Sequence, residues 1–540
     1  MDRRSFLIWS AATGGAGLAT AAGFLRWQEM NVQAHYPGRQ EGHYLRDRLQ
    51  DKRSLPKPSA EFKTDVVILG SGVAGLTAAW KMHKEDHHNF LMIDGPELYG
   101  NAAGGHFNGL AYPTGAHYLP LPSPESFHIR EMLSDLGIIL RNPMSDKPYY
   151  DERTILHAPE ERLLFNGAWQ DGFIPTEGVS PAEREEHHQF FKEVERLRAL
   201  KGRDGKRIFV FPTIHSSSDT EWAALDTISL KTWLEQNHYH SPTLHWYLNY
   251  CCRDDYGTRY DKVSAWAGLH YYCSRWGKAE NAQDGTWLTW PGGLHPLAMR
   301  LDQAAGQRRK KGTAVHLKKT IKGVEALCLE WVNGQPKTYT VHARKAICAM
   351  PLFVAARVVE SIHEYGFQPK EHLPQYAPWM ISNFLMKRMP EERPVAPLAW
   401  DNVVYQEPGL GYVVSTHQDI RSRPPEKSVF TAYRALSDRS PEEARKWLSS
   451  ATPEALLEAA SEDLKAAYGW KFAPCVEKVN ITVRGHAMSA PLVGFRSNAG
   501  IAALREQEGA IVFAHSDLSG FSVFEEAAWW GYRAAQQVFV

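Results

Sequence analysis

A short apolar run that leads directly into a glycine-rich turn constrains the fold of this chain more than any other feature. Residues 65–69 form a β-branched run, which is typical of a buried parallel strand. The turn Gly70-Ser71-Gly72-Val73-Ala74-Gly75 follows, and residues 76–84 are rich in Ala and Leu, which predicts a helix. A second apolar run, 90–93, ends in Asp94, 19 residues after Gly75. This order of strand, turn, helix, strand and acid predicts a dinucleotide-binding unit.

Each part of the unit has a physical task. Gly70 permits the tight turn, Gly72 lets a pyrophosphate approach the backbone, and Gly75 lets the helix pack on the strand. The helix N-terminus offers free N–H groups to the pyrophosphate, and Asp94 would accept hydrogen bonds from ribose hydroxyls. The predicted cofactor-binding positions are Gly70, Ser71, Gly72, Val73, Ala74, Gly75, Asp94 and Gly95. A purely structural turn is the alternative, because a lone GxGxxG is a weak signal.

The C-terminal end carries a second set of motifs. Residues 509–514 predict another buried strand, and Asp517 follows it. The closing helix then places its apolar residues on one face, at helical spacing: Val523, Ala527, Trp530, Ala534 and Val538. This arrangement resembles the C-terminal segment of the flavin-containing amine oxidase superfamily, whose fold is glutathione-reductase-like. The resemblance implies FAD as the cofactor, with Asp517 at its ribityl or pyrophosphate group. It also implies that the helix N-terminus near Val523 points at the flavin pyrimidine, where its dipole would stabilise negative charge.

The middle of the chain is similar to the same superfamily. Residues 290–298 resemble its Gly-Gly segment, and 346–351 resemble its strand that ends in Pro beside the cofactor. Residues 314–317, 321–329 and 338–343 resemble its three-stranded β-meander, and the resemblance implies that the main chain of Ile321 holds the adenine.

The expected fold class is therefore α/β: a Rossmann-like FAD-binding domain, with a parallel sheet plus a three-stranded β-meander, and an interleaved α+β substrate domain. We expect the FAD-binding domain to comprise residues 64–120, 288–360 and 480–540. Residues 121–287 and 361–479 would build the substrate domain. A length of 540 residues suits two connected domains.

Three departures from the superfamily pattern weaken amine specificity but leave FAD binding intact. Its usual Gly-Gly-Arg is replaced by Gly100-Asn101-Ala102, with a second glycine pair at Gly104 and Gly105. Its usual active-site Lys aligns with Asn383, and Lys387 comes a turn too late. Its final helix usually begins with an aromatic residue and Gly-Ala, where this chain has Val523 and Glu525-Glu526-Ala527. The last difference gives no support for an aromatic cage around an amine.

Candidate catalytic groups follow from the same alignment. His117 lies in residues 113–118, which match the stretch that passes over the flavin ring, and a His can take a proton near neutral pH. The alternative for His117 is a core histidine that is hydrogen-bonded in a turn. Asn383 would hydrogen-bond flavin N5 or the substrate in place of the missing Lys. His295 and His486 fall in segments expected near the flavin, where a structural role is favoured for both.

An aromatic stretch, 250–272, carries Arg253, Asp254 and Asp255. It suits either a substrate-binding helix pair or, preferably, an aromatic core with a surface salt bridge. The chain has 24 His but no third ligand near its His pairs, so no metal site is predicted.

The N-terminus has the features of an export signal. Arg3-Arg4 precedes a weakly apolar stretch that runs without charge from residue 8 to 25, which resembles a twin-arginine signal. We therefore expect residues 1–25 to be a signal peptide, the export machinery to be a partner, and the protein to be periplasmic. The alternative is an uncleaved signal that gives weak membrane association. Residues 26–63 are polar and predict a linker or surface arm.

Charge and cysteine content narrow the remaining choices. Lys plus Arg equals Asp plus Glu at 61 each, which argues against nucleic acid as a partner. The six cysteines have no metal-like spacing, and a disulfide among Cys251, Cys252 and Cys273 stays open.

The leading functional hypothesis is an exported FAD-dependent oxidoreductase that transfers a hydride from an organic small molecule to flavin N5. An amine, polyamine or amino acid is favoured as substrate, with oxygen or a periplasmic carrier as the electron acceptor. A desaturase or isomerase acting on a lipophilic substrate is the alternative, as is a non-catalytic flavin-binding protein. An amine enzyme needs acidic or aromatic groups beside the flavin, whereas a desaturase needs a wide apolar tunnel.

Overall fold

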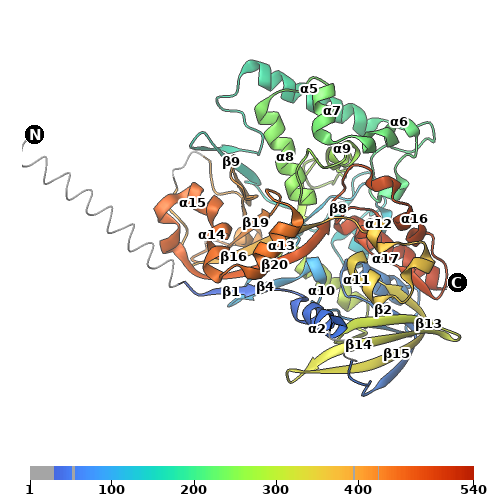
Figure 1. Cartoon of the computed structure of the whole chain (residues 1–540). Helices are drawn as coiled ribbons and strands as arrows, with labels where there is room; N and C mark the ends of the chain where they lie inside the picture. Colours follow the sequence, from blue (N-terminus) through green and yellow to red (C-terminus); the bar gives the residue numbers. More distant parts are fainter. Residues whose placement is uncertain (1–29, 51–54, 393–395, 424, 540) are drawn as a thin grey trace, which may run out of the picture.

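Two large β-sheets organise the chain, one with seven strands and one with eight (Figure 1). The computed structural model describes residues 30–50, 55–392, 396–423 and 425–539. The predicted signal peptide, residues 1–25, lies outside these described residues. Among the helices that the structure describes, none combines the length and the apolarity needed to cross a bilayer.

The seven-stranded sheet contains the predicted parallel core. Strand β2 (Glu61–Leu69) pairs in parallel with β3 (Phe90–Ile93) on one side and with β15 (Gln335–Cys348) on the other. Two short strands extend this core, β12 (Arg309–Lys310) beside β3 and β21 (Ile511–Phe513) beside β15. The order β12–β3–β2–β15–β21 therefore brings together strands from both ends and the middle of the chain. Because all five are parallel, their carboxyl ends meet at one edge.

The same sheet continues as the β-meander. Strands β13 (Thr313–Thr320), β14 (Gly323–Val332) and the first part of β15 are antiparallel, and they form the long yellow ribbon in Figure 1. The predicted fold class, a Rossmann-like domain with a parallel sheet and a β-meander beside a mixed α+β unit, is confirmed.

Helices cover the parallel strands and enlarge the predicted cofactor domain. Helix α3 (Val73–Lys84) packs against the closing helix α17 (Phe524–Phe539) and against α10 (His295–Ala304). Helix α4 (Phe127–Asp135) contacts α17, and its buried residues belong to the same hydrophobic core as β2. That core extends to Ile155, so the structure moves the domain boundary well beyond residue 120.

The eight-stranded sheet forms the substrate unit. Its order is β1 (Val32–His35), β20 (Val476–Ser489), β16 (Tyr376–Met386), β19 (Ser428–Ala435), β18 (Tyr412–Val414), β17 (Asp401–Val404), β9 (Glu161–Phe165) and β10 (Ala168–Asp171). All eleven residues of β16 are buried, because layers cover both faces of the sheet. Strand β20 was expected partly in the cofactor domain but pairs here, with β16 and β1.

Two groups of helices pack on this unit. One group shares a core with part of the sheet and comprises α5 (Pro181–Ala199), α7 (Leu230–Gln236), α8 (Pro242–Tyr256) and α9 (Ala265–Cys273). The other comprises α13 (Pro441–Ser450), α14 (Pro453–Ala460) and α15 (Glu462–Tyr468). All six cysteines are free and buried, so no disulfide joins Cys251, Cys252 or Cys273.

The predicted N-terminal arm is an ordered strap between the two sheets. Strand β1 pairs in parallel with β20, and helix α2 (Arg39–Gln50) follows it. The Tyr44 ring of α2 lies edge-on to Trp331 of β14, with 5.3 Å between ring centroids. The arm therefore contacts the substrate sheet and the β-meander within twenty residues.

We predict that Tyr44→Ala lowers the free energy of unfolding by about 1–2 kcal/mol, because it removes a partly buried aromatic contact between the two units. Thermal unfolding would show this as a loss of about 1–2 °C in a chain of this length. The control is Arg46→Ala on the same helix, because Arg46 is exposed and pairs with its exposed neighbour Asp47. Equal melting temperatures for the two variants would contradict the prediction that the Tyr44 contact between the arm and the β-meander stabilises the protein.

Candidate nucleotide and substrate site

Two glycines of the turn are required by the backbone around them. Gly70 has φ +114°, and a Cβ there would lie 2.7 Å from the Ala349 carbonyl oxygen at the end of β15. A Cβ on Gly75 would lie 1.9 Å from the Gly70 carbonyl oxygen. Since no side chain fits at either distance, these glycines let β2, β15 and α3 meet at the sheet edge.

The N-terminus of α3 is open to a ligand. Gly72 caps the helix without any side-chain hydrogen bond, and no atom lies within 4 Å of where its Cβ would be. Gly72 and Val73 are partly exposed, whereas Ser71 and Ala74 are buried. The Ser71 hydroxyl donates to the Asp94 carbonyl oxygen at 2.5 Å and thus ties the turn to β3. The free N–H groups suit an anionic group such as a pyrophosphate.

Asp94 presents one unpartnered oxygen at the same edge. Its Oδ2 accepts from Arg309 Nη1 at 3.3 Å, but Oδ1 is buried without a partner. Burial raises the pKa of Asp94, and the charge of Arg309 opposes this shift. An orphaned carboxylate oxygen here fits a ligand hydroxyl, such as a ribose hydroxyl.

The main chain that lies beside Asp94 is not the one that was predicted to hold the adenine. The Asp94 and Gly95 N–H groups donate to the Lys310 and Gly312 carbonyls, at 3.1 and 2.8 Å. Ile321 instead lies in the turn between β13 and β14, with its side chain fully exposed. At about 3.3 Å per residue, β13 carries Ile321 roughly 25 Å along the strand from Gly312. The prediction that Ile321 holds the adenine is therefore wrong, and residues 310–312 are the backbone next to Asp94.

Asp517 supplies a second unpartnered oxygen on the other side of the edge. Its Oδ2 accepts from the Leu352 N–H at 2.9 Å and from the Tyr376 hydroxyl at 2.6 Å, while Oδ1 is buried and unpartnered. Burial opposes ionisation, but the neighbouring His515 and these hydrogen bonds hold the pKa of Asp517 below its usual value. Asp94 follows β3 and Asp517 follows β21, three strands apart, or about 14 Å. One elongated polar ligand can span this distance.

The second glycine pair lies in close packing. Gly104 and Gly105 begin β4 (Gly104–Phe107), which forms a hairpin with β5 (Leu110–Pro113). A Cβ on Gly104 would meet His295, and one on Gly105 would meet the Tyr112 ring. Both glycines are therefore required by packing, while their main chain is partly exposed, and their cofactor role stays a prediction. Val523 lies partly exposed just before α17, where its carbonyl accepts from the Ala527 N–H.

His117 lies in a nest of aromatic rings. Its ring centroid is 4.6 Å from Tyr433, 5.0 Å from Tyr118 and 5.4 Å from Trp400. Burial lowers the pKa of His117 to about 3, so the ring is neutral at pH 7. A base of this pKa is weak at neutral pH, so burial disfavours the predicted transfer of a proton to the His117 ring. The neutral ring remains able to contact a substrate.

Asn383 is fully engaged inside the protein. Its Nδ2 donates to the Pro113 carbonyl at 3.1 Å, and its Oδ1 accepts from the Thr431 hydroxyl at 2.7 Å. Asn383 has no exposed surface. The prediction that its amide meets flavin or substrate is therefore wrong, and it holds residue 113 in place.

The other two histidines contact aromatic rings. His295 lies 5.5 Å from Tyr99, and burial lowers its pKa. His486 stacks on Phe353 at 4.5 Å, and burial lowers its pKa to about 4. Within the described parts of the chain, no three His, Cys, Asp or Glu side chains are grouped so as to hold a metal ion.

Three carboxylates act on one another close to Tyr433, the neighbour of His117, and sequence reasoning had singled out only Asp254 among them. Glu161 begins β9, Asp254 lies on α8, and Asp401 begins β17. All three side chains are partly buried. Burial raises the pKa of Glu161 and of Asp254 to about 7, and that of Asp401 well above its usual range. The charges of Asp254 and Glu161 raise the pKa of Asp401 further, and the charges of Asp401 and Asp254 also act on Tyr433, beside His117. The three carboxylates therefore form one interacting group, and two of them act on Tyr433.

The aromatic stretch 250–272 contributed one signal for these acids. Its predicted surface salt bridge is instead a buried pair, Arg275 Nη2 to Asp255 Oδ1 at 2.5 Å, and Asp254 beside it is partly buried. Glu161 and Asp401 stand at the starts of short strands and had no recognisable motif.

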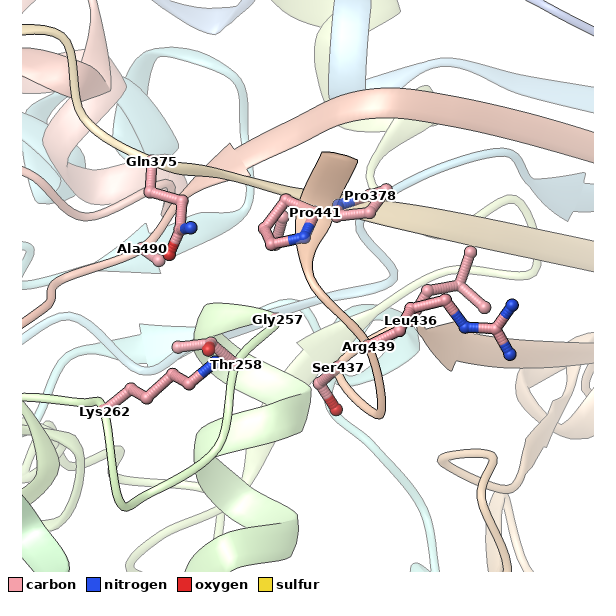
Figure 2. A pocket seen from close by; sticks show the side chains of 11 residues that line it. Gly257, Thr258, Lys262, Gln375, Pro378, Leu436, Ser437, Arg439, Pro441 and Ala490 are labelled. Carbon is pink, nitrogen blue, oxygen red and sulfur yellow. The ribbon is translucent and has the colours of Figure 1, made fainter. Parts of the chain in front are cut away.

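A small pocket lies at the start of β16, where Ala377 and Pro378 are among its lining residues. Figure 2 shows Gly257, Gln375, Pro441 and Ala490 around it. None of the residues predicted for the cofactor or for catalysis lines this pocket.

Comparisons with known proteins agree with this architecture. Residues 68–136 match the model of an NAD(P)-binding Rossmann-like domain. No curated protein sequence matches the chain.

Several solved structures share the fold at low identity. A putrescine oxidase double mutant is 15% identical, covers 89% of this chain and 99% of its own, and gives a TM-score of 0.61. Cyclohexylamine oxidase from Brevibacterium oxydans IH-35A is 17% identical over 88% and 98%, with a TM-score of 0.60. A fatty acid isomerase from P. acnes that produces CLA is 14% identical over 88% and 99%, with a TM-score of 0.56. These matches establish the fold.

Substitutions in the turn should separate folding from nucleotide binding. We predict that Gly75→Ala destabilises the protein by at least about 2 kcal/mol, because the new Cβ strikes the Gly70 carbonyl. Gly72→Ala meets no protein atom and should leave the melting temperature unchanged. It should nevertheless weaken flavin binding on the order of tenfold, by crowding the open face of the turn. Thermal unfolding and flavin titration check the pair, and normal flavin affinity in Gly72→Ala would contradict the nucleotide assignment.

Proposed function

We propose that this protein is an FAD-dependent oxidoreductase that oxidises an amine. The observation that carries the proposal is the cluster of Glu161, Asp254 and Asp401 beside the aromatic nest of His117. Within the described chain no salt bridge joins these three carboxylates to a cation, although the charges of Arg275 and Arg253 act on Asp254. Partly buried carboxylates in this state favour a ligand that brings positive charge, and aromatic faces favour ammonium groups.

FAD is the cofactor that the sheet edge fits best. Gly72 and the α3 N-terminus would hold its pyrophosphate, Asp94 its ribose, and Asp517 its ribityl or pyrophosphate end. The two unpartnered oxygens, Oδ1 of Asp94 and Oδ1 of Asp517, support this placement. When bound, the flavin supplies a hydride acceptor at N5. The protein's own part is to orient the substrate, exclude water and take up the released proton.

A lipophilic substrate is the second candidate, and its support is the similarity in fold to the fatty acid isomerase. Three carboxylates beside the expected reaction site disfavour an apolar chain there, since charged groups next to hydrocarbon lose hydration without compensation. An amine is therefore favoured over a lipophilic molecule as the substrate. A flavin-binding protein without catalysis remains an outcome of the test below.

Export through the twin-arginine pathway to the periplasm is part of the proposal. Its support is the Arg3-Arg4 pair and the uncharged, weakly apolar stretch that follows it. Electrons would pass to oxygen or to a periplasmic acceptor, and an uncleaved signal would add weak membrane association.

The decisive experiment is to purify the protein from periplasm, record its flavin spectrum, and add substrates without oxygen. Primary amines, diamines, polyamines and amino acids are expected to bleach the flavin, whereas fatty acids and alcohols of matched length are not. A flavin that fatty acids alone affect would support the isomerase-type reading. A flavin that nothing reduces would support a binding protein.

The carboxylate cluster predicts a pH dependence. Because Glu161 and Asp254 have pKa values raised to about 7, they gain protons as the pH falls through 7 and lose their attraction for a cation. The KM for an amine should therefore rise roughly tenfold between pH 8 and pH 6. Asp254→Asn should flatten this rise, whereas the fully exposed Asp86→Asn should not alter it. A KM that is independent of pH in the unaltered protein would argue against an ammonium bound at these acids.

A further inference from the structure

The segment that carries His117 is held in an unusual way. Residues 113–117 run between the nucleotide edge and the substrate sheet, and each of their five carbonyl groups accepts a hydrogen bond from a different part of the chain. The donors are Asn383 Nδ2 to Pro113 at 3.1 Å, Arg484 Nε to Thr114 at 3.0 Å, Tyr433 Oη to Gly115 at 3.0 Å, the Leu294 N–H to Ala116 at 3.1 Å, and Thr289 Oγ1 to His117 at 2.6 Å.

Four of the five donors are side chains, and three of these come from the substrate sheet. Asn383, Tyr433 and Arg484 lie on the neighbouring strands β16, β19 and β20. Buried carbonyls usually find partners in regular secondary structure, whereas these five are held by groups from distant parts of the chain.

The opposite side of the segment is bound to the nucleotide edge. The Ala116 N–H donates to the Asn101 carbonyl at 2.8 Å, and a Cβ on Gly115 would lie 2.1 Å from that same oxygen. The loop that contains Asn101 approaches the turn, since a Cβ on Gly100 would lie 3.5 Å from the Gly72 Cα. The segment is therefore clamped between the substrate sheet and the predicted pyrophosphate site.

We propose that residues 113–117 form a platform that fixes the His117 ring against the substrate, and that Tyr433, Asn383 and Thr431 are its positioning residues. This inference rests on the proposed function. Tyr433 acts twice, since its hydroxyl holds the Gly115 carbonyl while its ring packs on His117. Thr431 acts through Asn383, whose orientation it sets by donating to Oδ1.

Two conservative substitutions test the platform. Tyr433→Phe keeps the ring beside His117 and removes only the hydrogen bond to Gly115. Thr431→Val keeps the shape of the side chain and frees the Asn383 amide to rotate. Each should slow flavin reduction by a saturating amine about three- to tenfold, as expected for one lost hydrogen bond in the reacting geometry, with little change in KM.

Tyr256→Phe is the matched control. Tyr256 is also a buried tyrosine that donates to a backbone carbonyl, that of Ala267 at 2.8 Å, but this carbonyl is not part of the platform. Loss of the hydrogen bond from Tyr256 to Ala267 should leave the rate of flavin reduction unchanged.

Hydrogen–deuterium exchange gives a second readout that needs no turnover. The amides of residues 114–118 should exchange about three- to tenfold faster in Tyr433→Phe and Thr431→Val than in Tyr256→Phe. If both variants match the control in rate and in exchange, the platform is overturned. If no amine reduces the flavin, the proposed function fails, and the exchange data alone decide whether the segment is held as inferred.

Discussion

The close approach of Gly70 to the Ala349 carbonyl is the constraint on which the cofactor half of this protein depends. It lets β2 and β15, which pair in parallel, end side by side, although 279 residues separate Gly70 from Ala349. Once these ends meet, β3 and β21 flank them and bring Asp94 and Asp517 to the same edge. The nucleotide site is therefore a consequence of strand order. Neither end of the chain can form it alone, so the unit should fold cooperatively across most of its length.

The sequence predicted this half well because its signals are local. The glycine turn, the strand before it and Asp94 lie within 30 residues, and each glycine has a steric reason that reads directly from spacing. The error at Ile321 shows the limit. The hydrophobic pattern predicted strands in the β-meander, but it did not reveal that residues 321–322 make the turn between β13 and β14. The expected adenine contact, Ile321, therefore lies beyond the end of β13 that is far from Asp94.

The substrate half could not be predicted in the same way, because its site is made by long-range pairing. Asn383 was found as a replacement for an absent Lys, yet its role depends on Thr431 and Pro113. Pairing of β16 with β19 brings Thr431 to it, and packing of β5 against the same sheet brings Pro113. Glu161 and Asp401 become neighbours only because β9 and β17 pair in parallel, with Asp401 opposite Glu161. No periodicity in the sequence encodes that juxtaposition, so the feature that best defines the substrate emerges only from the fold.

The same juxtaposition decides which group can accept a proton. A free primary amine has a pKa near that of Lys, about 10, and must lose a proton before its nitrogen lone pair can assist oxidation. Transfer to His117, with a pKa of about 3, would be uphill by roughly seven units. Transfer to Asp254 or Glu161, with pKa values of about 7, is uphill by only about three. On the proposed function the burial that makes these carboxylates costly to the fold also makes them the better bases. The imidazole of His117 is then left to shape the substrate pocket, which explains why its backbone, rather than its ring nitrogens, is so firmly held.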